Sequence, residues 1–90
     1  MFRSGPMANK QVVLTVYSRE GCHLCDEMLE EIQALPARTQ FSLEIVDVDG
    51  DDELRQRFDT LVPVLMGEEG EICHYFLDHA AVNAYLGNIR

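Results

Sequence analysis

The chain has 90 residues, which is enough for one domain and too few for two. Hydrophobic residues make up 47% and charged residues 26%, a globular balance that excludes a wholly disordered or fibrous chain. The formal net charge of −9 repels phosphate backbones and anionic lipids, so we expect neither nucleic acid nor a membrane surface as a partner. Three cysteines cannot all pair within one molecule, and without a secretory signal they do not predict a scaffold built from disulfides.

The N-terminal segment predicts no targeting function. Residues 1–10 lack the apolar core of a signal peptide, and no stretch of the chain approaches the roughly 20 apolar residues of a membrane span. We therefore expect residues 1–10 to be a disordered leader and residues 11–90 to form a single domain. Because nothing in the sequence directs export, we expect the protein to act in the reducing cytoplasm. We also expect it to be a monomer.

The first half of the chain predicts a strand, a helix and a second strand. Residues 12–17 are nearly all apolar or β-branched, as in a strand that is buried on both faces. Apolar residues then recur with helical spacing from Cys22 onward, and Pro36 ends that segment. Residues 41–48 read as another strand. Such a unit crosses over with a right hand, so the two strands should be parallel.

The second half predicts a short helix, a hairpin and a last helix. Residues 51–58 form a charged helical segment, and residues 61–66 form a strand that Pro63 interrupts near its start. A turn at residues 67–70 joins it to a partner strand at 72–76. Asp78 can cap the last helix. The order βαβαββα predicts an α/β fold of three layers, α/β/α, around a mixed four-stranded sheet.

The sharpest chemical feature is the segment Cys22-His23-Leu24-Cys25, which follows the first strand and opens a helix. The N–H groups of a first helical turn stabilise a thiolate, so the pKa of Cys22 should lie below the free-thiol value of about 8.5. The spacing of one turn brings Cys25 back beside Cys22. We therefore predict that Cys22 is a nucleophile and that Cys25 resolves its mixed disulfide. His23 either lowers the thiol pKa further as an imidazolium or is an exposed spacer.

Metal chemistry is the weaker interpretation of the same residues. A zinc site would need two more ligands, and the obvious candidates, Cys73 and His74, are strand neighbours that point to opposite faces. We expect no metal site, and we interpret Cys73 as a buried, inert thiol in preference to a regulatory one. The acids of residues 47–53 lack the glycine that a calcium loop requires at its sixth position, where Asp52 stands, so they predict a solvated turn and helix start.

Taken together, these motifs resemble the glutaredoxin-like proteins of the thioredoxin superfamily over roughly residues 11–87. The resemblance is carried by residues 18–25, by Val62-Pro63-Val64 and by the helix that begins at Asp78. It implies that residues 11–90 are a glutaredoxin-like domain with a thioredoxin-like fold and the sheet order two-one-three-four. It also implies a cis Val62–Pro63 bond facing the cysteines, with the Val62 backbone pairing with a bound peptide or glutathione.

The resemblance also implies further substrate contacts. The family's basic residue falls on Arg19, which would meet a glutathione carboxylate and favour the Cys22 thiolate. Asp78 would offer a helix N-terminus to the γ-glutamyl end of glutathione. The chain departs from the family pattern in two places. The pair between the cysteines is not Pro-aromatic, and residues 75–79 replace the glycine pair that usually follows the fourth strand.

Two functions of different classes follow. The first is a thiol–disulfide oxidoreductase in cell redox homeostasis and electron transport. Its partner would be a disulfide-containing protein or a glutathione mixed disulfide, with no tightly bound cofactor and with glutathione as a candidate co-substrate. The alternative is a low-turnover binding or adaptor module that holds an iron–sulfur cluster between two copies through Cys22. Cys25 favours the first function, because a resolving cysteine has no role in such a cluster site.

Overall fold

A computed structural model describes residues 12–88 of the chain, and the leader predicted for residues 1–10 lies outside them. Within these residues, no helix is long and apolar enough to cross a membrane. The elements, in chain order, are β1 (Val13–Ser18), α1 (His23–Gln33), the 3-10 helix η2 (Pro36–Gln40), β2 (Ser42–Asp47), the 3-10 helix η3 (Val48–Gly50), α2 (Asp52–Phe58), β3 (Val64–Gly67), β4 (Gly70–His74) and α3 (His79–Asn88).

The four strands form one mixed sheet in the order β2-β1-β3-β4, which confirms the predicted topology. β1 and β2 are parallel, with Val16 opposite Ile45. β3 is antiparallel to β1, with Leu65 opposite Val16, and β4 is antiparallel to β3. The first strand therefore lies inside the sheet, as its continuous apolar sequence requires.

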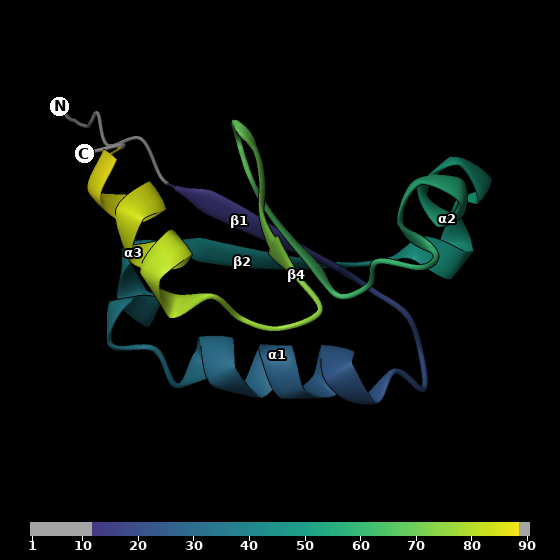
Figure 1. Cartoon of the computed structure of the whole chain (residues 1–90), viewed down its shortest axis with the longest axis horizontal. Coiled ribbons are helices and arrows are strands. Elements are labelled where there is room, and N and C mark those ends of the chain that lie inside the picture. Colours follow the sequence, from purple (N-terminus) through teal and green to yellow (C-terminus); the bar gives the residue numbers. More distant parts are fainter. Residues whose placement is uncertain (1–11, 89–90) are drawn as a thin grey trace, which may run out of the picture.

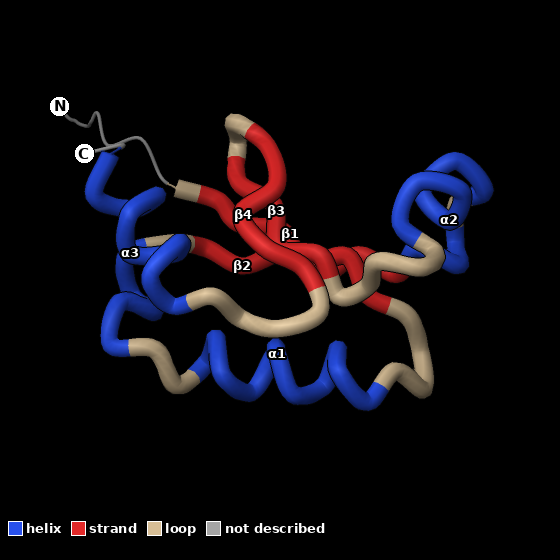
Figure 2. The backbone as a smooth tube through the Cα atoms, viewed as in Figure 1, coloured by secondary structure: helices blue, strands red, loops and turns tan. Residues whose placement is uncertain are grey.

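Helices pack on both faces of the sheet, so the three-layer arrangement is confirmed (Figures 1 and 2). Neighbouring residues of β1 point to opposite faces. Val16 packs with α1 and α3 in one core cluster, which includes the fully buried Met28 and Val82. Tyr17 packs with α2 in a second cluster, where its ring stacks on Phe58 at a centroid distance of 4.6 Å.

The strands of the hairpin begin and end at other residues than the sequence predicts. β3 begins at Val64, because the amides of Leu61 and Val62 both donate to the Phe58 carbonyl at the end of α2. Pro63 therefore precedes the strand instead of interrupting it. β4 ends at His74, and the chain leaves it at Tyr75, a non-glycine residue with φ of +66°. No sequence pattern indicated η2 either.

Candidate active site

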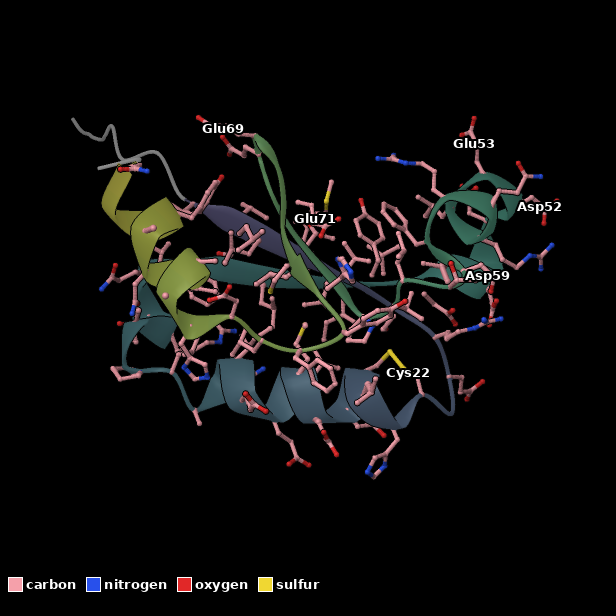
Figure 3. All side chains as sticks on the ribbon, in the orientation of Figure 1. Cys22, Asp52, Glu53, Asp59, Glu69 and Glu71 are labelled. Atoms are coloured by element: carbon pink, nitrogen blue, oxygen red, sulfur yellow. A yellow bond between two sulfur atoms is a disulfide. The ribbon has the colours of Figure 1, made fainter. Side chains whose placement is uncertain are left out.

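The start of α1 carries the two cysteines, which form a disulfide (Figure 3). Gly21, with φ of +77°, turns the chain into the helix. Cys22 is the N-cap, and its sulfur accepts a 3.1 Å hydrogen bond from the Cys25 amide. Cys22 is partly exposed, whereas Cys25 is 1% exposed. The predicted pairing is confirmed, and the geometry leaves only the first cysteine open to a large substrate.

The segment before β3 packs against the disulfide. The Val62–Pro63 bond is cis, as the resemblance implied. Val62 belongs to the same apolar cluster as Cys25, and Cys22 packs against that cluster. The Val62 amide already donates a 3.1 Å hydrogen bond to the Phe58 carbonyl within the chain. A peptide or glutathione that paired with this amide would have to displace that bond, whereas pairing with the Val62 carbonyl would leave it intact.

Tyr75 holds the same segment from the other side, a role that the sequence did not reveal. Its amide donates a 2.9 Å hydrogen bond to the Pro63 carbonyl. Its hydroxyl donates a 2.7 Å hydrogen bond to the Thr60 carbonyl. Tyr75 thus ties the end of β4 to both sides of the Val62–Pro63 bond. The only sequence signal is an aromatic residue directly after a strand, which is too common to identify such a contact.

Arg19 is engaged by two aspartates. Its guanidinium forms ion pairs with Asp49 at 3.0 Å and with Asp59 at 2.6 Å. A hydrogen bond from Arg19 to the Asp49 carboxylate, together with the charge of that carboxylate, raises the pKa of the guanidinium, and the Asp59 carboxylate adds to this effect. Asp49 lies in η3 and Asp59 follows α2. The sequence did not reveal either partner, because they lie 30 and 40 residues from Arg19.

The other candidate residues have local partners. His23 is 87% exposed at its side chain and pairs with Glu27 at 3.0 Å, one turn along α1. The Asp78 carboxylate accepts a 3.0 Å hydrogen bond from the Ala81 amide, so its predicted capping of the last helix is confirmed. The structure thus brings Cys22, Cys25 and Val62 together in one cluster.

Cys73 lies on β4 and is a free, buried thiol, as predicted. Burial raises the pKa of this thiol; a hydrogen bond from the Asp78 backbone acts against that effect, and the charges of Asp78 and Glu71 add to it. It belongs to the core cluster beside α1 and α3 and not to the cluster that contains Cys25. Across residues 12–88, no group of three or more His, Cys, Asp or Glu side chains is placed to hold a metal ion.

Comparisons with known proteins agree with this geometry. The model of the glutaredoxin-like domain family DUF836 matches residues 13–87. The structure of protein Ne2328 from Nitrosomonas europaea is 40% identical and has a TM-score of 0.74, with 86% of this chain and 93% of that chain covered. The structure of protein XcR50 from X. campestris is 30% identical with a TM-score of 0.61, covering 86% of this chain and 99% of its own.

A more distant match shows the fold alone. Thioredoxin 1 from Thermosipho africanus is 20% identical with a TM-score of 0.58, covering 84% of this chain and 96% of its own. None of the curated proteins matches the chain. The fold and the paired cysteines together support a redox-type function. With the family match extending over nearly all of the described residues, the chain belongs to the glutaredoxin-like domain family DUF836 of the thioredoxin superfamily.

Proposed function

We propose that this protein is a thiol–disulfide oxidoreductase that serves redox homeostasis in the reducing cytoplasm. The observation that carries the proposal is the pairing of a partly exposed Cys22 at a helix N-terminus with a buried Cys25. An exposed sulfur can reach a substrate, and a helix N-terminus stabilises its thiolate. A buried sulfur one turn later is within reach of the first sulfur and shielded from other thiols.

The proposed reaction begins from the reduced protein. The Cys22 thiolate attacks one sulfur of a substrate disulfide, and the other substrate sulfur leaves as a thiolate that takes a proton from solvent. The Cys25 thiolate then attacks the Cys22 sulfur of the mixed disulfide. This step forms the Cys22–Cys25 disulfide and releases the second substrate thiol. Two electrons pass to the substrate, and two glutathione thiols or the dithiol of a reductase protein return them.

The substrate in this proposal is a disulfide-containing protein or a glutathione mixed disulfide, and the working form is a monomer. Val62 and Pro63 would form the wall against which the substrate lies, since Val62 shares the apolar cluster with both cysteines. The Asp78 carboxylate caps the N-terminus of α3. Asp78 would therefore contact glutathione only as part of that helix N-terminus. The iron–sulfur alternative is not favoured, because Cys25 lies where it can pair with Cys22, and a resolving cysteine has no role in a cluster held through Cys22 alone.

Trapping of the mixed disulfide tests the proposal. The Cys25→Ser variant keeps the nucleophile and removes the resolving thiol, so incubation with bis(2-hydroxyethyl) disulfide should give a stable adduct on Cys22, visible by mass spectrometry. The Cys22→Ser variant should give no adduct at neutral pH, although it retains two thiols. The Cys73→Ala variant should turn over like the native protein. An adduct that forms equally well without Cys22 would show that the nucleophile is assigned wrongly.

A further inference from the structure

The Arg19 ion pairs bear on which disulfides this site accepts. Arg19 stands three residues before Cys22, where a free guanidinium would attract an anionic substrate. It is instead bound by Asp49 and Asp59, at 3.0 and 2.6 Å, and it also donates to the Asp59 backbone carbonyl at 3.5 Å. The three charged groups together carry one negative charge.

The three residues come from the segments that surround the disulfide. Arg19 precedes the N-cap of α1, and Asp49 follows Val48, which packs with Cys25 in the apolar cluster. Asp59 is the C-cap that follows α2, three residues before Val62. The group therefore adjoins the surface from which a substrate would approach Cys22. All three side chains are between 34% and 49% exposed, so their net charge acts on ligands in solution.

The immediate neighbours of Cys22 add negative charge and no free cation. Glu20, Asp26 and Glu27 lie within five positions of Cys22. The exposed His23 beside Cys22 pairs with Glu27. Within the described residues, the other arginines are in η2 and α2, outside the segment that leads into Cys22. Glutathione, whose γ-glutamyl and glycyl carboxylates are anionic, would meet repulsion at this site.

Residues 75–79 replace the family's glycine pair after the fourth strand, and they include an exposed aromatic ring. Phe76 stands there with 66% of its surface exposed, directly after Tyr75, which is bonded to the Pro63 carbonyl. An exposed aromatic ring next to this segment offers a contact to an apolar side chain of a polypeptide. Glutathione has no apolar side chain to use it.

We propose that Asp49 and Asp59 are specificity-determining residues, which hold Arg19 away from anionic ligands and select polypeptide disulfides flanked by basic residues over glutathione disulfides. This inference rests on the proposed oxidoreductase function and names the substrate class. In the reaction, the two thiols of the reduced protein become the Cys22–Cys25 disulfide while the two sulfurs of the cationic polypeptide disulfide become thiols. The aspartates touch no reacting atom and act only through charge and through Arg19.

The test compares three dimeric peptide disulfides built on one cysteine, flanked by two lysines, two glutamines or two glutamates. Each is mixed with pre-reduced protein, the reaction is quenched with acid, and the products are separated by chromatography. Rates are divided by those of dithiothreitol with the same peptides, which removes intrinsic differences between the disulfides. At low salt the lysine peptide should react about fivefold faster than the glutamate peptide, the scale of exposed charge interactions. Salt at about 1 M should remove most of that ratio.

Two double variants locate the effect. Asp49→Asn/Asp59→Asn frees Arg19 and should bring the lysine-to-glutamate ratio to one or below, with a faster reaction of the glutamate peptide. Asp52→Asn/Glu53→Gln makes the same change in net charge at the outer end of α2, away from Cys22 (Figure 3), and should keep the ratio above one. Far-ultraviolet circular dichroism establishes that both variants are folded.

Each outcome decides the matter. A native ratio near one, or a ratio that the two double variants change equally or not at all, overturns the selection by Asp49 and Asp59. The oxidoreductase function stays intact in that case, provided that the glutamine peptide is reduced. If the protein reduces none of the three peptides faster than the reference dithiol, dithiothreitol, does, the proposed function fails and the inference fails with it. A ratio that is lost only in Asp49→Asn/Asp59→Asn supports the proposal.

Discussion

The backbone amide of Cys25 donates a 3.1 Å hydrogen bond to the sulfur of Cys22. The same atom pair would remain close after reduction, because Cys22 is the N-cap of α1 and the helix fixes both positions. A hydrogen bond to a charged sulfur is stronger than one to a neutral sulfur, so this contact favours the thiolate. The same hydrogen bond thus caps the start of α1 and stabilises the thiolate that the proposed reaction requires.

Loss of the Tyr75 hydroxyl should affect the site more than it affects the fold. Tyr75→Phe removes the hydrogen bond to the Thr60 carbonyl and should lower the free energy of unfolding by about 0.5–1.5 kcal/mol. It should also slow reduction of disulfides by Cys22, because the segment before β3 is less firmly held. Urea denaturation and single-turnover rates measure the two effects.

Tyr85→Phe is the matched control for Tyr75→Phe. The Tyr85 hydroxyl accepts a 2.7 Å hydrogen bond from the Glu68 amide in the hairpin turn. Its loss should cost a similar free energy of unfolding without a change in the rate at Cys22. If both variants slow the reaction equally, the slower rate reflects general loosening and Tyr75 has no particular role in positioning the site.

Asp78 can be tested separately as a helix cap and as a ligand contact. Asp78→Ala removes the acceptor for the Ala81 amide and should lower the free energy of unfolding by about 1 kcal/mol. Asp78→Asn keeps an acceptor and should restore most of that loss. A role in glutathione binding through its negative charge predicts instead that Asp78→Asn changes KM for a glutathione mixed disulfide while stability stays near that of the native protein.

Cys73 should make the protein less stable at alkaline pH. Burial raises the pKa of its thiol in the folded state above the unfolded value, so the folded state holds this proton more tightly. The resulting stability is fully present below the unfolded pKa of about 8.5 and is lost as pH rises through the higher folded pKa. Denaturation of the native protein and Cys73→Ala from about pH 7 to about pH 10.5 should therefore show a steeper alkaline decline for the native protein. Parallel curves would contradict this account.

Most of the fold was predictable because it is encoded in local patterns. The apolar run of β1, the helical spacing of α1 and the capping Asp78 each depend on residues close together in the sequence, and each is confirmed. The start of β3 was not predictable in the same way. It depends on hydrogen bonds from the Leu61 and Val62 amides to the Phe58 carbonyl at the end of α2, and no periodic pattern in the sequence predicts such contacts.

In the candidate site, too, the local features were predictable from the sequence and the contacts between distant segments were not. The paired cysteines follow from a spacing of one helical turn, and the structure confirms the disulfide. The partners of Arg19 and the two bonds of Tyr75 are contacts between segments that the fold alone brings together. The position of Arg19 before Cys22 marks it as a site residue, but nothing local in the sequence indicates that two aspartates hold it.

The central claim is that Cys22 is a thiolate nucleophile near neutral pH. The direct measurement is the pH dependence of iodoacetamide alkylation in Cys25→Ser/Cys73→Ala, whose one thiol is Cys22. The backbone amide at position 25 would still donate its hydrogen bond to the Cys22 sulfur, while the nearby acids Glu20, Asp26 and Glu27 oppose a further negative charge only through screened interactions. We predict a pKa clearly below the free-thiol value of about 8.5. A pKa at or above that value would contradict the assignment of Cys22 as the nucleophile.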